Sequence, residues 1–212
     1  MKRFIALSCL WVAALTVLCS CSETKKTSEY SNWEERNSDY IESIAQQCAQ
    51  FRSQGVTVDN AQENQMFRLL SYKLDPSQEW ENSSYVYCQV IKNGNGTDTP
   101  FFTDSVYVNY RLRLIPTDNY PEGQVMDQSY KTAKLDPDIN IPAAFQVSSC
   151  VKGVSTALMY MNCGDIWRIY IPQGLGYGSS PKTGSSIPEY STLIFDLNLV
   201  EIARTGQELS PR

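Results

Sequence analysis

The chain has 212 residues, which is enough for one ordinary domain with additions. Its 42% hydrophobic and 19% charged residues are typical of a globular protein rather than a disordered one. The net charge of −5 argues against a nucleic-acid partner, and the lack of histidine excludes histidine-based triads and the commonest metal ligand. We therefore expect no nucleic acid, no metal and no cofactor.

The N-terminus has the organisation of a lipoprotein signal peptide over residues 1–20. A short basic start is followed by an apolar run, Phe4 to Leu18, that is too short for a membrane-spanning helix. The run ends in Leu18-Cys19-Ser20-Cys21, which resembles a bacterial lipobox. In this interpretation Cys21 carries the lipid and becomes the mature N-terminus. The alternative is an ordinary signal peptide followed by a stray cysteine.

Residues 21–31 are predicted to be a tether. Ser22 to Ser31 is polar and shows no apolar periodicity. A lipid on Cys21 would hold the chain at a membrane of the bacterial cell envelope. Because Ser22 is not the aspartate associated with retention in the inner membrane, we expect the outer membrane, on its periplasmic or its surface face.

Four cysteines remain after the signal peptide and the lipidated cysteine are set aside: Cys48, Cys88, Cys150 and Cys163. Export makes disulfides chemically accessible, and four cysteines allow three pairings. The same residues equally suit buried, unpaired thiols. The sequence leaves both alternatives open.

The mature chain is predicted to begin with an amphipathic helix over about 32–53. Ser31 or Asn32 would cap this helix, and Gly55 would end it. Apolar residues recur inside it at helical spacing, at Tyr40, Ile41, Ile44, Ala45, Cys48 and Phe51. This apolar stripe must be buried, either against the same domain or in a homodimer.

From residue 84 onward the sequence predicts short strands around one helix. Residues 56–81 are hard to interpret, and 66–70 could be helix or strand, so 32–81 is described as an N-terminal helical extension. Period-two alternation predicts the strands, and a short helix is predicted over 152–161. The predicted strands are 85–91, 106–114, 143–149, 167–171 and 193–199. This pattern indicates an α+β fold in which the helix covers one face of an antiparallel sheet.

Residues 84–204 also carry a series of motifs. In chain order they are Val106-Tyr107-Val108-Asn109-Tyr110, Asp127, Phe145, Val151-Lys152-Gly153, Ala157-Leu158, Met161, Gly164-Asp165, Ile169-Tyr170-Ile171-Pro172, Leu175-Gly176-Tyr177-Gly178, Ile187-Pro188 and Ser191-Thr192-Leu193-Ile194-Phe195-Asp196-Leu197. In this order and spacing they resemble the FKBP family of peptidyl-prolyl cis–trans isomerases. The resemblance implies an FKBP-type domain: a twisted antiparallel sheet wrapped around one short helix, with an apolar pocket between them.

The resemblance also implies which residues line the pocket. Carried over position by position, they are Tyr110, Asp127, Phe145, Val151, Tyr177, Ile187 and Phe195, with Val154 at the pocket floor. Asp127 is expected to accept a hydrogen bond from a neighbour such as the Tyr110 hydroxyl, or to face the rim. The chain departs from the family pattern at Met126, where a phenylalanine is usual, and at the small floor residue. Two loops, 115–125 and 128–144, are also long.

Such residues suit isomerisation of the X–Pro peptide bond, which needs no nucleophile, base or metal. Amide resonance sets a barrier of about 18–20 kcal/mol and separates charge between the carbonyl oxygen and the nitrogen. Twisting the bond removes this charge separation, so a dry apolar pocket favours the twisted transition state. The resemblance therefore implies an isomerase that assists the folding of exported, proline-containing polypeptides. The alternative is a binding module or chaperone that has kept the fold without turnover.

Overall fold

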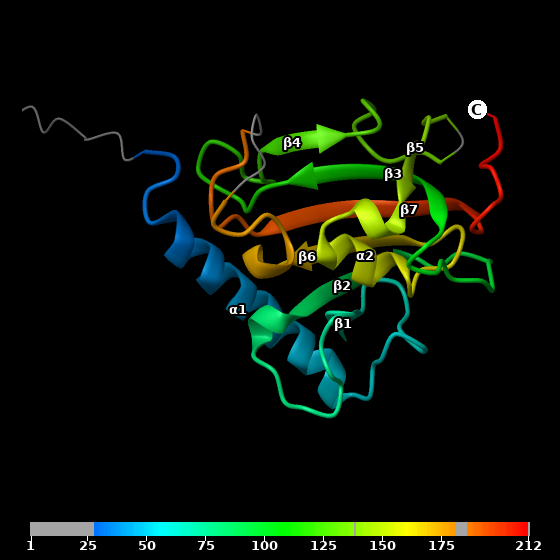
Figure 1. Cartoon of the computed structure of the whole chain (residues 1–212). Helices are drawn as coiled ribbons and strands as arrows, with labels where there is room; N and C mark the ends of the chain where they lie inside the picture. The colour runs from blue at the N-terminus through cyan, green and yellow to red at the C-terminus, as the bar shows by residue number, and fades with distance from the viewer. Residues whose placement is uncertain (1–27, 138, 181–185, 212) are drawn as a thin grey trace, which may run out of the picture.

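The computed structural model describes residues 28–137, 139–180 and 186–211; the predicted signal peptide and Cys21 lie outside the described residues. A seven-stranded sheet forms the centre of the molecule, with helix α1 (Trp33–Ser53) and the short helix α2 (Lys152–Leu158) beside it (Figure 1). The strands are β1 (Met66–Leu70), β2 (Tyr85–Lys92), β3 (Ser105–Arg113), β4 (Val125–Gln128), β5 (Ala143–Gln146), β6 (Ile166–Ile171) and β7 (Leu193–Ala203). The predicted α+β class is confirmed.

All neighbouring strands are antiparallel, in the order β1-β2-β6-β7-β3-β4, and β5 pairs with the first half of β3. The ambiguous residues 66–70 form β1, an edge strand of this sheet, although they lie in the segment predicted to be a helical extension. The sequence does not predict β4, because four residues are too few for period-two alternation to stand out.

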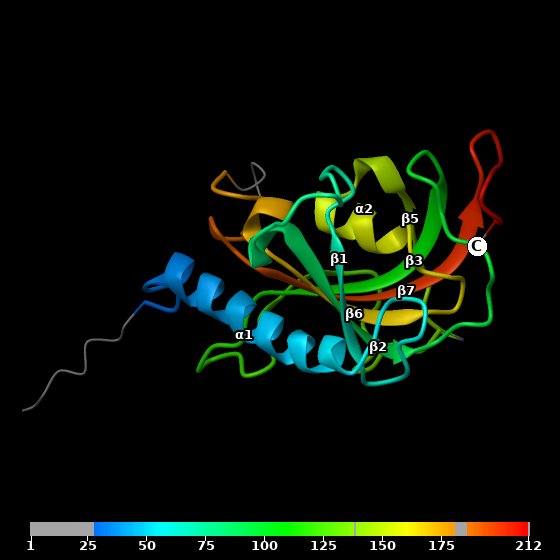
Figure 2. The same cartoon turned by 90° about the horizontal axis from the view of Figure 1, so that it is seen from below.

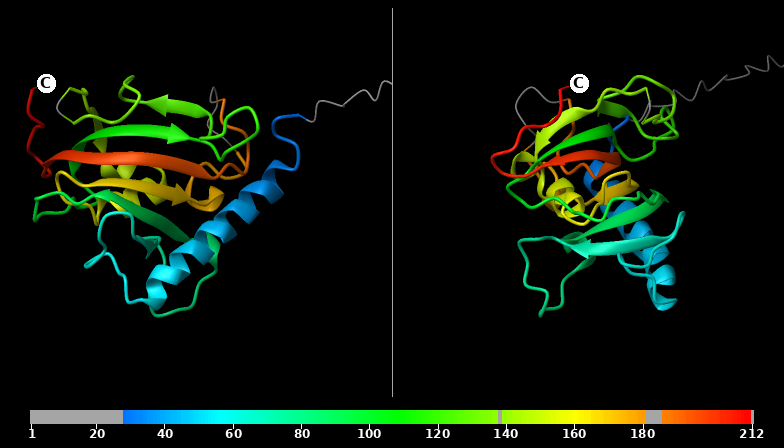
Figure 3. Two further views of the ribbon diagram at one scale, coloured as in Figure 1. Left: turned by 180° about the vertical axis from the view of Figure 1, so that it is seen from behind. Right: turned by 90° about the vertical axis from the view of Figure 1, so that its right-hand side faces the viewer.

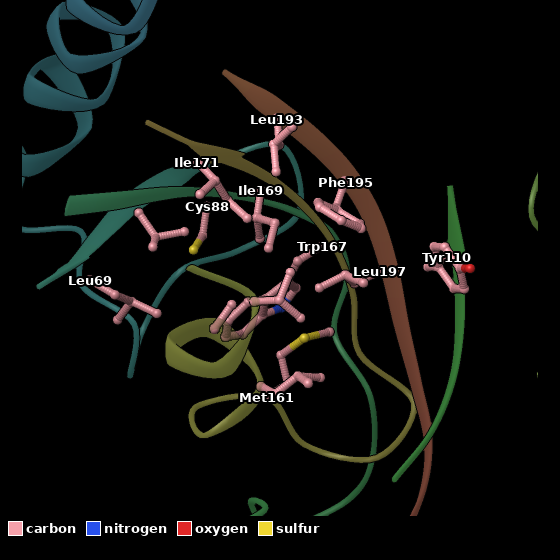
Figure 4. Packing of buried hydrophobic residues seen from close by; sticks show 14 of the residues in the cluster. Leu69, Cys88, Tyr110, Met161, Trp167, Ile169, Ile171, Leu193, Phe195 and Leu197 are labelled. Atoms are coloured by element: carbon pink, nitrogen blue, oxygen red, sulfur yellow. The ribbon is translucent and has the colours of Figure 1, made fainter. Parts of the chain in front are cut away.

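Helix α2 packs against one face of the sheet, which curves around it (Figure 2). Buried side chains of β6, Trp167 among them, and of β7 pack together near Met161 (Figure 4). Ala157 and Leu158 of α2 are fully buried in the same cluster. A Cβ on Gly153 would lie 2.4 Å from a methyl carbon of Ile171, so glycine is what allows α2 to approach β6 this closely.

Helix α1 covers the opposite face of the sheet (Figures 2 and 3). Ile41, Ile44 and Cys48 are buried there among apolar residues of the sheet, which include Met66, Tyr87, Tyr170 and Ile194. The apolar stripe of α1 is therefore buried against its own sheet. A homodimer through this helix stays a prediction, and it would have to use the exposed, polar face of α1.

Polar contacts fix the N-terminal half of α1 to the start of β7. The indole Nε1 of Trp33 donates to the Ser191 hydroxyl at 2.9 Å. The Thr192 N–H donates to Oδ1 of the buried Asn37 at 2.7 Å. Residues before the helix are also held, because the Tyr30 hydroxyl donates to Oε1 of Gln124 at 2.7 Å. The last residues of the predicted tether thus pack against the loop between β3 and β4.

Helix α1 begins where predicted but lacks the predicted side-chain cap. Asn32 adopts a left-handed conformation with φ of 51°, and its side chain makes no capping hydrogen bond. Its carbonyl accepts the Arg36 N–H at 2.9 Å. Gly55 follows the helix with φ of 83°, a conformation that favours glycine after a helix. In the described ranges no helix, α1 included, is long and apolar enough to cross a bilayer.

The four described cysteines are free thiols. Cys48 and Cys88 are buried, whereas Cys150 and Cys163 are partly exposed. Burial raises the pKa of the Cys150 thiol to about 11 and raises that of Cys88 well above its usual range. Of the two alternatives left open by the sequence, the structure therefore has unpaired thiols that pack as small apolar groups.

Replacing Ile44 with Ala is expected to lower the free energy of unfolding by about 2–5 kcal/mol, because it opens a cavity between α1 and the sheet. Ile44 is only 4% exposed. Urea denaturation measures the loss. Gln47→Ala, at an exposed position of the same helix, is the matched control and should change stability by less than about 0.5 kcal/mol. Equal stability of the two variants would contradict the packing of α1 on the sheet.

Candidate functional site

Three aromatic side chains meet on the α2 face of the sheet. The ring centroid of Tyr110 lies 5.1 Å from that of Phe145 and 6.3 Å from that of Phe195. These residues come from β3, β5 and β7, and β3 pairs with both of the other strands. Figure 4 shows Tyr110 and Phe195 on their neighbouring strands. Strand pairing thus assembles an aromatic group from residues that are far apart in the sequence.

A hydrogen bond joins this group to Asp127. The Tyr110 hydroxyl donates to Asp127 Oδ2 at 2.8 Å, which is the expected contact. Asp127 lies on β4 opposite Leu112 and is exposed, and its other oxygen accepts the Gln128 N–H at 2.8 Å. Burial, and after it the bond to Asp127, raise the pKa of Tyr110. The phenol therefore stays protonated at neutral pH and remains a hydrogen-bond donor.

Tyr177 lies in the same environment, just beyond the turn Gln173–Leu175 that follows β6. Burial raises the pKa of its hydroxyl first, and the nearby Asp127 and Cys150 raise it further. The turn is closed by the Gly178 N–H, which donates to the Gln173 carbonyl at 2.9 Å. The site therefore contains a second neutral hydroxyl beside the aromatic group.

Cys150 is a further candidate residue that the sequence alone did not identify. It packs against the main hydrophobic cluster, as Tyr177 does, is partly exposed, and contributes to raising the pKa of the Tyr177 hydroxyl. The signal that could have found it is its position immediately before Val151 in the family motif. Burial raises its pKa, so it stays a thiol at neutral pH and is not an activated nucleophile.

The remaining candidate residues belong to the same cluster but differ in exposure. Val154 of α2 and Ile187 are buried, at 3% and 7% exposed. Val151, which precedes α2 at the N-cap position without a side-chain cap, is partly exposed, as are Phe145 and Tyr177. The candidate residues therefore range from buried, at Val154 and Ile187, to partly exposed, at Val151, Phe145 and Tyr177.

The segment that carries Ile187 is held from the other side of the sheet. The Ser191 hydroxyl donates to the Pro188 carbonyl at 2.7 Å and accepts the Trp33 indole N–H. Helix α1 thereby supports the backbone that follows Ile187. This contact joins residues more than 150 positions apart, so no local sequence pattern could have predicted it.

A comparison with known protein families agrees with this arrangement of strands, helix and candidate residues. Residues 96–200, which include all eight candidate residues, match the family model described as FKBP-type peptidyl-prolyl cis-trans isomerase. This part of the chain belongs to the FKBP family. The FKBP domain includes strands β3 to β6 and most of β7, whereas α1, β1 and β2 precede the matched range.

Several curated relatives each match a little over half of the chain. The peptidyl-prolyl cis-trans isomerase Mip of Coxiella burnetii is 37% identical over 116 residues, which are 55% of this chain and 44% of the relative. The FKBP-type 22 kDa isomerase of Escherichia coli is 38% identical, over 54% of this chain and 48% of its own. The outer membrane protein MIP of Legionella longbeachae is 33% identical, over 56% and 44%. The chain thus spans about half the length of these relatives.

Phe195→Ala in the FKBP domain is expected to cost about 3–5 kcal/mol of stability, because it opens a cavity in the core as well as removing a wall of the site. Phe195 is 7% exposed. Tyr110→Phe is the contrasting variant, since it keeps the ring and loses only the bond to Asp127, worth about 0.5–1.5 kcal/mol. Thermal and urea unfolding give both values. A cost below about 1 kcal/mol for Phe195→Ala would contradict its place in the core.

Proposed function

We propose that the chain is a peptidyl-prolyl cis–trans isomerase that acts on proline-containing polypeptides in the bacterial cell envelope. The observation that carries the proposal is the aromatic group of Tyr110, Phe145 and Phe195 beside the Tyr177 hydroxyl, inside an FKBP domain. The relatives from Coxiella burnetii and Escherichia coli are themselves named as such isomerases, which supports the same activity here.

The apolar side chains favour the twisted peptide bond by excluding water. Tyr110, Phe145, Phe195, Val151 and Val154 would surround the proline ring. In water the planar ground state is stabilised, because its separated charges are solvated. A dry environment removes the solvation of the planar ground state. The less polar twisted state loses little solvation free energy. The barrier of about 18–20 kcal/mol is thereby lowered without any covalent step.

Polar groups at the rim would orient the substrate. The Tyr177 hydroxyl and the Ile187 N–H would donate to the carbonyls that flank the proline. Asp127 would act indirectly. It accepts the hydrogen bond of the Tyr110 hydroxyl at 2.8 Å and would so hold the Tyr110 ring in place beside the proline. These roles require neutral hydroxyls, in agreement with the raised pKa values of Tyr110 and Tyr177.

A binding module without turnover is the competing function. It is favoured by Val154, which is smaller than the family's usual floor residue, and by Met126 beside Asp127. An isomerisation assay of the wild-type chain on a short proline peptide and on an unfolded protein separates the two. Absence of activity on both substrates would favour the binding module.

Tyr177→Phe is expected to lower kcat/KM about 2- to 13-fold on a short proline peptide, because it removes one hydrogen bond worth about 0.5–1.5 kcal/mol. The melting temperature should barely move. Tyr160→Phe, at a residue 46% exposed just beyond α2, is the matched control and should keep full activity. Full activity of Tyr177→Phe on both peptide and protein substrates would remove Tyr177 from the site.

We also propose that the protein is anchored in the envelope, most simply the outer membrane, by a lipid on Cys21. The support is the sequence Leu18-Cys19-Ser20-Cys21 and the polar residues that follow it. A relative from Legionella longbeachae named as an outer membrane protein agrees with this location.

Cys21→Ala should abolish labelling of the protein by a metabolically supplied fatty acid and release it from the membrane fraction. Cys19→Ala, two residues away, is the matched control and should retain the label. Label retained in Cys21→Ala would sink the assignment of the lipid to this cysteine.

A further inference from the structure

A cavity of about 310 Å³ lies on the α1 face of the sheet, opposite the candidate site. Successive side chains of a strand point to opposite faces, so Phe195 faces α2 whereas Ile194 and Asp196 face α1. The cavity is lined by Tyr40, Arg113, Pro116, Pro121, Glu122, Arg168, Tyr170 and Ile194. In Figure 3 the N-terminal part of α1 lies beside the loop between β3 and β4, and these two elements border the cavity.

Two arginines of this cavity share a single carboxylate. Arg113 Nη1 lies 2.5 Å from Asp196 Oδ2, and Arg168 donates to the same carboxylate through Nε at 2.6 Å and Nη2 at 3.1 Å. The side chains of Arg113 and Asp196 are only 10% and 13% exposed. Burial alone would raise the pKa of Asp196, but the two guanidinium groups lower it, so the carboxylate is charged at neutral pH. The group therefore carries a net charge of +1, with Arg113 and Asp196 mostly buried and the Arg168 side chain 38% exposed.

Arg113 also has unused donors. A guanidinium group has five N–H donors, and among the hydrogen bonds of the described residues Arg113 uses only Nη1. Glu122 lines the cavity but is exposed, and within the described ranges it forms no ion pair with Arg113 or Arg168. Arg113 is mostly buried and shares its carboxylate with the partly exposed Arg168, so an anion bound from the cavity would balance the remaining positive charge.

We infer that this cavity binds a small monocarboxylate with an apolar body. Its carboxylate would accept hydrogen bonds from Arg113 and Arg168, whose planar guanidinium groups match carboxylate geometry. Tyr40, Tyr170 and Pro121 would contact the apolar body. The volume lies at the lower end of the range for small-molecule sites, which excludes a large ligand. A free organic acid and the C-terminal carboxylate of a peptide share this chemistry.

Binding of 3-phenylpropionate to the full chain tests the inference, with the uncharged 3-phenylpropionamide as the matched probe. Calorimetry or an NMR titration should show the acid binding at least tenfold more tightly than the amide. Arg168→Gln should weaken binding of the acid at least tenfold, whereas Lys134→Gln, at an exposed position of the loop between β4 and β5, should not change it. Equal affinity for acid and amide, unchanged affinity in Arg168→Gln, or no binding of the acid at about 10 mM would overturn the inference.

A second variant keeps the test decisive if Arg168→Gln fails to fold. Glu122→Gln removes an exposed negative charge at the cavity and should tighten binding of the acid about two- to fivefold, since it removes a repulsion screened by water. Unchanged or weaker binding in this variant would overturn the inference.

A tetrapeptide ending in Phe, with a free or an amidated C-terminus, assigns the source of the carboxylate. Binding of the free form alone supports a polypeptide end, and binding of 3-phenylpropionate alone supports a free acid.

Discussion

The antiparallel pairing of β3 with β7 is the constraint on which both faces of the molecule depend. Its register runs from Ser105 opposite Ala203 to Arg113 opposite Ile194, with one bulge after Tyr107. It puts aromatic side chains on the α2 face and charged side chains on the α1 face. A slip of one residue would exchange the two sets, placing charges in the core and rings at the surface. The hydrophobic core and the candidate site therefore select the same register.

Helices on both faces turn the middle of the sheet into an interior layer. Helix α2 closes the face that carries the aromatic group, and α1 closes the other face, so β6 and β7 are largely buried. The two faces are linked at Ser191, which bonds the Trp33 indole of α1 and the Pro188 carbonyl of the segment after Ile187. Helix α1 is thus part of the scaffold of the candidate site, although it lies outside the matched FKBP range.

The chemistry of the two faces is opposite in kind. The candidate site on the α2 face has neutral hydroxyls, a thiol and aromatic rings, and the carboxylate of Asp127 lies at its exposed edge. This environment suits a reaction in which charge separation decreases. The α1 face instead holds a partly buried group of charges, in which Arg113 and Asp196 are mostly buried and Arg168 is partly exposed. One sheet separates the two environments because its side chains alternate.

The sequence by itself determined the local elements and the identity of the candidate residues. Helical spacing predicted α1, period-two alternation predicted β3, β6 and β7, and the order of family motifs predicted the site residues from Tyr110 to Phe195. Only the tertiary structure decided that 66–70 is an edge strand, that β4 exists, that Cys150 influences Tyr177 and that Asp196 pairs with two arginines. The reason is physical. A periodic pattern shows which side of an element is buried, because that side is set by neighbours about three residues away in a helix and two residues away in a strand. Which other element covers the buried side depends on contacts between segments that are distant in the sequence. A local pattern does not contain information about those contacts.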